Sequence, residues 1–530
     1  MTNIVYNFQH KTKNVGLIIL LSIVKCCGVL GIDGYEVEVE TDLSLGIPAF
    51  EIVGLGDTTV RESKERVRAA IKNTGFEFPT RRITINLAPA SLRKEGSAFD
   101  LPIAVGIMAA CGYIPSDALN EYMFVGELSL DGNIKAVTGV LPMAICAAEN
   151  RVKYMVLSVQ NAKEAAVVKD ISVLPATCLG DIVRHFTKEA IIPAYEVDID
   201  GIFSSQITSE VDFADVRGQE NVKRAMEVAA SGAHNLIMVG SPGSGKTMLA
   251  RRMPTILPYL SFDEALEVTK IHSIAGTLPA NTSLITTRPF RSPHHTTSAI
   301  GLIGGGKYPK PGEISLSHYG VLFLDEVPEF SKDALEVLRQ PLEDGMVTIS
   351  RVNASLSYPA KTTLILAANP CKCGKYLESK EECTCTPKQV QQYLGKLSGP
   401  LLDRIDIHIE VSSVKYNDLE STNKEEPSSI IRERVNKARK IQLERYKGLG
   451  IYSNSQLQPS MLSKYCYLND HCKALLRNAF DRLGLSARAY SRILKVARTI
   501  ADMEEEEAIS KSHLAEAIQY RSLDRHFWQL

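Results

Sequence analysis

The sequence has no excess of charge of either sign. Its 530 residues include 60 Lys and Arg against 61 Asp and Glu, which leaves a formal net charge of -1. This balance gives no evidence for a nucleic-acid partner, so any basic surface has to be local. Internal repeats and low-complexity tracts are also missing. Hydrophobic residues make up 45% of the chain and charged residues 23%. A chain of this length and ordinary globular composition predicts about two to four domains.

No apolar run is long enough to cross a membrane. The only candidate, Val15–Val24, is roughly half of the ~20 residues that a membrane-spanning helix needs. Its length resembles the core of a signal peptide, but the following Lys25-Cys26-Cys27 is a poor cleavage site. We favour a first β-strand that follows a leader, residues 1–21, and the sequence leaves open whether this leader is native.

The cysteines do not form the dense set of a small disulfide-bonded domain. There are 11 in this long chain, an odd number that suits a reducing cytosol. Seven are scattered: Cys26, Cys27, Cys111, Cys146, Cys178, Cys466 and Cys472. Four follow the pattern C-x-C-x9-C-x-C: Cys371, Cys373, Cys383 and Cys385.

This four-cysteine cluster has two interpretations. Two close pairs of thiolates can hold Zn²⁺ tetrahedrally and fix the loop between them. C-x-C is tighter than the common C-x₂-C spacing, so four reduced thiols on a loop are the alternative. With every position a cysteine, a metal here has no open coordination site, and we expect a structural rather than a catalytic role.

The N-terminal segment, residues 22–195, alternates strand-like and helix-like patterns. Tyr35–Glu40 and Arg82–Leu87 alternate as strands, and Val60–Asn73 has the spacing of an amphipathic helix. Asp100–Cys111 is predicted as a buried helix, with Pro102 in its first turn.

A polar stretch, Tyr195–Val211, predicts a domain boundary. The segment 212–412 carries the chemical motifs. A loop of Ser, Asn, Glu and Pro then leads into a helical segment, so that 413–530 is predicted as a third domain.

A phosphate-binding loop stands at the centre of the chain. It fits G-x-x-x-x-G-K-[ST], between the apolar strand Leu236–Val239 and a helix that begins at Thr247. Glycines allow backbone N–H groups to surround phosphate oxygens, and the helix N-terminus adds positive potential. Lys246 is predicted to reach the β- and γ-phosphates of ATP, and the Thr247 hydroxyl to bind Mg²⁺. The loop consists of Gly240, Ser241, Pro242, Gly243, Ser244, Gly245, Lys246 and Thr247.

Two more apolar strands end in polar residues downstream. Val321–Leu324 is followed by Asp325, predicted to complete the Mg²⁺ shell, and by Glu326, predicted to be the general base. Thr363–Ala368 is followed by Asn369, predicted to orient the attacking water. Solvated acids and a turn-forming Asn are the alternatives, and the spacing from the phosphate loop favours the nucleotide site.

Together with these motifs, further segments resemble the ComM/YifB family of magnesium-chelatase-like AAA+ ATPases. The resemblance covers residues 22–523. It implies an α/β protein with a Lon-protease-like N-terminal domain (22–195, a ribosomal-protein-like α+β fold), a P-loop AAA+ αβα core (212–412) and a C-terminal helical lid (413–530). The matching segments are Ile52–Leu55, Asn86–Ala90, Lys94–Gly96, Ser292–Thr296, Gly312–Ser315, Val321–Glu326, Gly399–Asp406 and Leu485–Ala489.

The resemblance also assigns two arginines. Arg404 matches the arginine finger, which reaches the ATP of a neighbouring subunit and stabilises charge on the transferring phosphoryl group. Arg488 matches the second sensor position. A surface salt bridge is the alternative for both, and Arg492, one turn from Arg488, is a possible substitute for it.

Lon-type proteases use a Ser-Lys pair. Here the expected lysine position falls near Leu141, and Ser97 is out of register with the expected serine. We therefore expect no protease activity, and we expect the domain to bind a partner or to support the ring.

Two segments are candidate substrate contacts. Ser292–Thr296, with His294 and His295 beside Arg291, is either a loop toward the pore of a ring or a structural loop. Arg432–Lys447 holds seven Lys or Arg and two Glu, either as a phosphate-contacting helix or as the solvated face of an amphipathic helix.

The resemblance implies a cytoplasmic, homo-oligomeric ring, with a hexamer expected, that uses ATP and Mg²⁺. We expect a DNA motor that acts on branched or single-stranded DNA as a helicase in recombination or natural transformation (competence). The alternatives are a protein-remodelling or chelatase-type ATPase with a protein client at the N-terminal domain, and a slow regulatory scaffold. No membrane partner is expected.

Overall fold

The computed structural model describes residues 21–204, 210–279, 281–306, 309–351, 354–377, 382–413 and 425–523. Two compact units divide the chain between Ile199 and Asp200, and Gly276–Leu284 belongs to the first unit. The predicted leader, 1–21, lies outside the described residues except for Leu21. Within the described part of the chain, none of the helices combines the length and the apolar character needed to cross a membrane.

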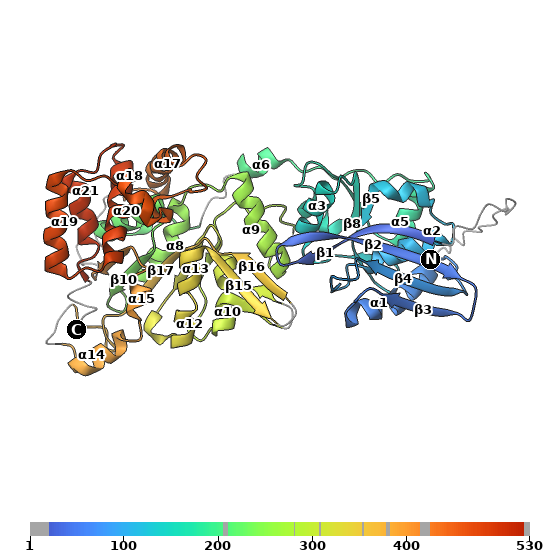
Figure 1. Ribbon diagram of the computed structural model, residues 1–530, viewed down its shortest axis with the longest axis horizontal. Helices are drawn as coiled ribbons and strands as arrows, with labels where there is room; N and C mark the ends of the chain where they lie inside the picture. The colour runs from blue at the N-terminus through green and yellow to red at the C-terminus, as the bar shows by residue number, and fades with distance from the viewer. Residues whose placement is uncertain are drawn as a thin grey trace. The chain divides into compact units, whose positions relative to one another are not determined.

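The first unit is built on a seven-stranded mixed sheet (Figure 1) with the order β3-β4-β2-β1-β5-β8-β9. The long β1 and β2 form an antiparallel pair, whereas β5, β8 and β9 run parallel to β1. The predicted strands at 35–40 and 82–87 are confirmed within β2 and β4. The strands are β1 (Leu21–Leu30), β2 (Asp33–Ser44), β3 (Ala49–Val53), β4 (Arg82–Ala88), β5 (Tyr122–Phe124), β8 (Tyr154–Ser158) and β9 (Ser172–Ala176), with the small hairpin β6 (Glu127–Leu128) and β7 (Ile134–Lys135).

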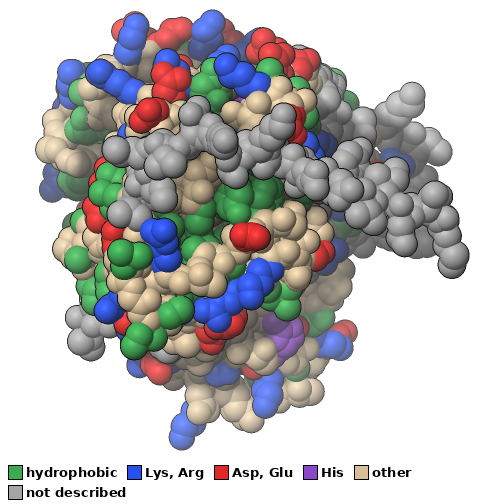
Figure 2. Space-filling model, turned by 90° about the vertical axis from the view of Figure 1, so that its right-hand side faces the viewer, with side chains coloured by type: hydrophobic (Ala, Val, Ile, Leu, Met, Phe, Trp, Pro, Cys, Tyr) green, Lys and Arg blue, Asp and Glu red, His purple; other side chains and the backbone are tan. Residues whose placement is uncertain are grey.

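Helix α2 (Asp100–Ala110) is buried along its whole length, as its uniformly apolar sequence predicts. Its one buried charge, Asp100, accepts two hydrogen bonds from Arg66, at 2.6 and 2.9 Å. The other helical segments of the first unit are α1 (Thr58–Asn73), η1 (Ser116–Glu121), α3 (Val140–Glu149), η2 (Val159–Asn161), α4 (Ala162–Ala165) and α5 (Leu179–Phe186). Helix α6 (Ile199–Ser204) begins at the last residue of the first unit and continues in the second. On the face of the molecule in Figure 2, Lys and Arg side chains are interspersed with Asp and Glu, in keeping with the balanced composition.

The second unit contains a five-stranded parallel sheet with the order β11-β14-β17-β10-β18. Because β14, β17 and β10 are neighbours and run parallel, the residues that follow them meet at one edge of the sheet. This arrangement positions the candidate site. The strands are β10 (Leu236–Gly240), β11 (Phe290–Arg291), β14 (Val321–Leu324), β17 (Thr363–Ala368) and β18 (Ile407–Val411).

Helices and two hairpins surround this sheet. The hairpins are β12 (Gly304–Gly305) with β13 (Lys310–Pro311), and β15 (Met346–Arg351) with β16 (Ala354–Pro359). The helices are η3 (Phe213–Asp215), α7 (Glu220–Gly232), α8 (Lys246–Ile256), α9 (Phe262–Ala275), α10 (Ala299–Ile303), α11 (Glu313–Leu316), η4 (Val327–Glu329), α12 (Lys332–Glu336), α13 (Arg339–Asp344), α14 (Pro387–Leu394) and α15 (Gly399–Leu402).

The C-terminal part of the second unit is helical. Its elements are α17 (Ser428–Arg445), η5 (Asn454–Gln456), α18 (Pro459–Tyr465), α19 (Asp470–Leu483), α20 (Ala487–Met503) and α21 (Lys511–Gln519). The apolar faces of α17 and α20 join α7 and α8 in one hydrophobic core. The described C-terminal helices therefore belong to the same compact unit as the phosphate loop.

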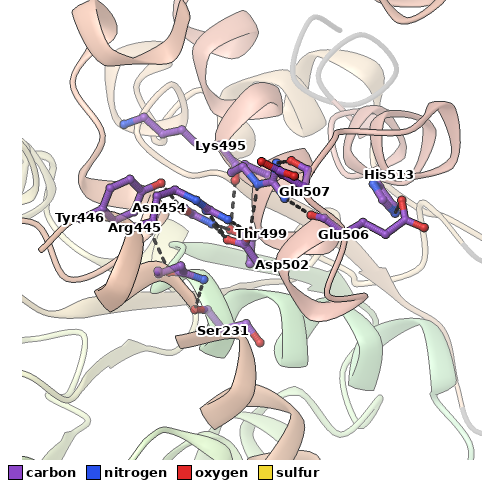
Figure 3. A network of polar contacts seen from close by, with 12 residues as sticks. Ser231, Arg445, Tyr446, Asn454, Lys495, Thr499, Asp502, Glu506, Glu507 and His513 are labelled. Atoms are coloured by element: carbon purple, nitrogen blue, oxygen red, sulfur yellow. Dashed lines mark hydrogen bonds and ion pairs between the residues drawn. The ribbon is translucent and has the colours of Figure 1, made fainter. Parts of the chain in front are cut away.

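The helix predicted at 432–447 lies largely within α17, whose apolar face is buried at Ile431, Val435 and Ala438. Three of its arginines are engaged by other parts of the chain. Arg434 donates to Glu227 and Glu426, both at 2.5 Å. Arg439 donates to two backbone carbonyls, and burial lowers the pKa of Arg439 to about 10. Arg445 points into the network of Figure 3, where it donates to Asp502. Helical periodicity predicts the helix, but the groups that accept hydrogen bonds from these arginines lie outside it.

Candidate functional site

The phosphate loop connects the buried strand β10 to helix α8. Gly240 lies against β18 so closely that a Cβ there would collide with the carbonyl oxygen of Val411, which explains the need for glycine. Gly245 precedes the first residue of α8, Lys246. The N-terminus of this 11-residue helix therefore faces the loop, where its backbone N–H groups and positive potential can bind an anion.

Lys246 is held inside the loop. Its Nζ donates to the carbonyl oxygens of Gly240 at 2.7 Å and Ser241 at 2.8 Å, and to Oδ1 of Asn369 at 3.3 Å. The contact with Asn369 joins the end of β17 to the phosphate loop. The structure thus brings together two residues that the sequence separates by more than one hundred positions.

Thr247 and Asp325 provide a pair of adjacent oxygen ligands. Oγ1 of Thr247 donates to Oδ2 of Asp325 at 2.6 Å. A hydroxyl and a carboxylate at this distance fit the hard-oxygen, octahedral preference of Mg²⁺, which normally keeps several waters as well. The donor set is therefore suitable for the predicted metal.

Glu326 follows Asp325 in a left-handed conformation, with φ of 49°. Its N–H donates to Oδ1 of Asp325 at 2.9 Å, so the two acids share one turn. The Glu326 side chain is more than half exposed, and Oε2 lies 3.9 Å from Nδ1 of His295. A carboxylate beside the phosphate loop and open to water is suited to accept a proton from a nucleophile.

The segment Ser292–Thr296 follows β11, the neighbour of β14. Arg291 is engaged by Glu313 through two hydrogen bonds, at 2.7 and 2.8 Å, and His294 contacts Thr296. His295 is the member that faces Glu326. Sequence reasoning missed this pairing because it depends on β11 lying next to β14, which no local pattern reveals.

The Arg404 side chain contacts its own segment and α13. Its side chain is buried, with Nη2 2.5 Å from Oε1 of Glu343 and Nη1 donating to the carbonyl oxygen of Pro400 at 2.7 Å. Its Nε has no hydrogen-bond partner among the described residues. Arg404 and Arg339 line a cavity of about 380 Å³, and Arg339 lies 2.5 Å from Glu336.

Arg488 and Arg492 have different surroundings. Arg488 is exposed, and its Nη1 lies 3.4 Å from Oδ2 of Asp403, next to Arg404 in the chain. Arg492 is mostly buried and lies 3.0 Å from the buried Asp406, which also contacts His234. Burial by itself would raise the pKa of Asp406, but the cations around it, Arg492 first, lower it below its usual value. Arg492 therefore forms a buried ion pair, whereas the Arg488 side chain is open to solvent.

The four clustered cysteines meet directly after Asn369 and Pro370. The Sγ atoms of Cys371 and Cys373 are 3.3 Å apart, and Cys383 lies 3.8 and 3.6 Å from them. Cys385 completes a group in which all four Sγ atoms lie within 4.8 Å of one another. The backbone N–H of Lys375 is the main contact that lowers the pKa of Cys373, to about 5.

In the first unit, Ser97 hydrogen-bonds to Glu127, and Leu141 is fully buried. The nearby Lys94 is buried and donates to the carbonyl oxygen of Pro89. None of the hydrogen bonds of the described residues joins Ser97 to a lysine. The expectation that this unit is not a protease stays a prediction.

Three family models match the chain. These describe magnesium chelatase subunit ChlI at residues 212–419, a further ChlI segment at 39–161 and the ChlI C-terminal segment at 425–521. The chain is 43% identical over 507 residues to the competence protein ComM of Haemophilus influenzae, covering 95% of this chain and 98% of that protein. It is 41% identical to YifB of Escherichia coli, with the same two coverages.

A more distant relative is the magnesium-chelatase subunit ChlI of Mesostigma viride, at 23% identity over 47% of this chain and 65% of that protein. The match to ComM and YifB spans both compact units, and the family models cover the phosphate loop, the acidic pair and the C-terminal helices. The parallel sheet agrees with the α/β P-loop fold of these families. The chain therefore belongs to the ComM/YifB family of magnesium-chelatase-like AAA+ ATPases.

Proposed function

We propose that this protein is a cytoplasmic, ring-forming motor that hydrolyses ATP to move branched or single-stranded DNA, and so promotes branch migration during recombination or natural transformation. The observation that carries the ATPase part is the convergence of three strand ends: Lys246 contacts Asn369, and Thr247 contacts Asp325. The DNA part is supported by the relative named a competence protein.

Each residue of the site has a proposed role. The loop Gly240–Thr247 surrounds the phosphates with N–H groups, and Lys246 turns from the loop carbonyls to the β- and γ-phosphates. Mg²⁺ bound by Thr247 and Asp325 would neutralise phosphate charge. Glu326 accepts a proton from the attacking water, and Asn369 holds that water toward the γ-phosphate.

Arg404 is proposed to act on the ATP of a neighbouring subunit. Its guanidinium contacts Glu343 rather than its own phosphate loop, and it lines a cavity with Arg339. This placement supports a role for Arg404 on the phosphates of a second subunit, and we take the assembly to be a hexameric ring. Arg488, exposed beside Asp403, is proposed as the second sensor.

The cysteine cluster is proposed to hold a structural Zn²⁺. The first unit is proposed to be a Lon-like domain without protease activity that recruits a partner. Two apolar side chains between β2 and β3, Leu45 and Ile47, are 86% and 88% exposed. Exposed apolar residues favour a protein contact, so remodelling of a protein client is the second candidate function.

The test is ATP hydrolysis by the purified protein with and without branched DNA, with Lys246→Ala as the blank. The proposal expects DNA to stimulate hydrolysis, the blank to lose both basal and stimulated rates, and the stimulation to fall steeply with salt. Hydrolysis that no DNA form changes would contradict the DNA motor and lead to a search for protein clients of the first unit.

A further inference from the structure

The spacing of the four thiols matches a tetrahedral metal site. Zinc–thiolate bonds of about 2.3 Å place the sulfurs of a tetrahedron roughly 3.8 Å apart. The three Sγ distances among Cys371, Cys373 and Cys383 are 3.3, 3.8 and 3.6 Å, and Cys385 lies within 4.8 Å of each. These separations are far longer than a disulfide bond, and all four cysteines are free.

The chemistry of this donor set selects its ligand. Four thiolates without a carboxylate or a water position favour Zn²⁺ over Mg²⁺ or Ca²⁺, which prefer oxygen. An exposed ion pair between Lys375 and Glu382, 3.0 Å apart, joins the two arms that carry the cysteine pairs. The chain itself supplies all four coordination positions.

The cysteine site touches the phosphate loop. Gly374, between Cys373 and Lys375, has φ of +85°, and its N–H donates to the carbonyl oxygen of Cys371 at 3.0 Å. A Cβ at Gly374 would overlap Cδ of Pro242 and lie 2.7 Å from Cγ of the same ring. The turn that carries the first cysteine pair thus packs its backbone against Pro242, in the middle of the phosphate loop.

The same turn is tied to the end of β17. Cys371 is buried and lies two residues after Asn369, whose Oδ1 accepts from Lys246. A shift of Cys371 would be transmitted through Pro370 to Asn369. Two contacts, one with Pro242 and one through Asn369, therefore connect the cysteine site to the phosphate-binding machinery.

We propose that Cys371, Cys373, Cys383 and Cys385 bind one Zn²⁺ per chain, and that the metal holds the Cys371–Gly374 turn against Pro242 so that the phosphate loop binds ATP tightly only in the zinc-loaded protein. This inference rests on the proposed nucleotide site and adds a metal dependence to it. Loss of zinc, or oxidation of the thiolates by an external oxidant, would weaken nucleotide binding without touching Lys246 or Thr247.

The test measures two quantities on the full chain: zinc content by elemental analysis, and the affinity for a fluorescent ATP analogue at equilibrium. The wild type should contain one zinc, and chelation under reducing conditions should weaken ATP binding at least tenfold, with recovery on addition of Zn²⁺. The paired substitution Cys383→Ser and Cys385→Ser should remove the metal and give the same loss. Cys111→Ser, in the first unit, is the matched control and should change neither quantity.

A second variant separates the contact from the metal. Gly374→Ala should keep its zinc and still weaken ATP binding, because a Cβ cannot fit against Pro242. Lys246→Ala should keep its zinc and lose ATP binding. This variant therefore shows what failure of the nucleotide site looks like when the metal site is intact. The inference is overturned if the reduced wild type neither contains nor takes up Zn²⁺, or if the zinc-free protein binds ATP as tightly as the loaded protein. Recovery on adding Zn²⁺ excludes irreversible misfolding.

Discussion

Glu326 occupies a backbone conformation that non-glycine residues rarely adopt. A left-handed φ of 49° costs on the order of 1 kcal/mol or more, and such conformations persist where the surrounding structure fixes them. Here the turn is fixed by the hydrogen bond from Glu326 N–H to Asp325. The carboxylate is presented toward His295, 3.9 Å away, and this neighbour is the natural candidate for orienting it.

We predict that His295→Ala lowers the turnover number for ATP by about tenfold and leaves KM for ATP nearly unchanged. The substitution removes a neighbour of the proposed base but no contact of the phosphate loop. Steady-state hydrolysis over a range of ATP concentrations checks both parameters.

His294→Ala is the matched control for this prediction. His294 hydrogen-bonds to Thr296 at 2.9 Å and its ring centroid lies 4.0 Å from that of His295, but the contact with Glu326 belongs to His295. Its loss should leave turnover close to wild type. Equal losses in the two variants would point to a general disturbance of the loop rather than to a role of His295 at Glu326.

At the scale of elements, the C-terminal helices are joined by a buried acid. Asp502 on α20 is fully buried and accepts from Arg445 of α17 at 2.9 Å, from Arg498 at 3.0 Å and from Asn454 at 2.8 Å (Figure 3). Removing one partner of a buried ion pair leaves an uncompensated charge, which costs about 3–5 kcal/mol. This one carboxylate therefore holds α17, η5 and α20 together.

Asp502→Ala is predicted to lower the free energy of unfolding of the second unit by about 3–5 kcal/mol, because Arg445 and Arg498 lose their common acceptor. Urea unfolding followed by far-UV circular dichroism measures the change. Lys437→Gln, which removes an exposed charge of α17 at a 3.9 Å ion pair, should change stability by less than about 0.5 kcal/mol. A shared unfolding midpoint for the two variants would mean that the network contributes nothing measurable.

Some elements of the fold could be predicted from local sequence patterns. Strands such as β4 and the buried helix α2 were predictable because alternation and uniform apolarity are local. The motif residues around Lys246 were also identifiable, since each follows an apolar strand. Their proposed roles stay predictions.

Long-range contacts were not predictable in this way. The enclosure of Arg404 by Glu343 and the packing of Gly374 on Pro242 join segments that are far apart in sequence. The acceptors of the α17 arginines were not predictable for the same reason. Periodicity tells which residues share a face, but the acid that covers an arginine comes from another element, as Glu227 does for Arg434.

At the scale of the whole molecule, the proposed role of Arg404 requires two subunits to contribute to each nucleotide site. In a head-to-tail ring, each nucleotide site combines the loop of one subunit with the arginine of the next. Under this proposal, assembly would exchange the Arg404–Glu343 ion pair for a contact with phosphate, and hydrolysis would depend on ring formation.

Mixing two inactive variants tests this division directly. Lys246→Ala chains lack a working loop but keep Arg404, and Arg404→Ala chains have the reverse defect, so each alone should be inactive. In a one-to-one mixed ring about a quarter of the interfaces pair an intact loop with an intact arginine, and hydrolysis should recover in that proportion. Native mass spectrometry of the mixture confirms that mixed rings form. If mixed rings form and stay inactive, Arg404 acts within its own chain, and its cavity beside Arg339 belongs to the fold rather than to a neighbour's nucleotide.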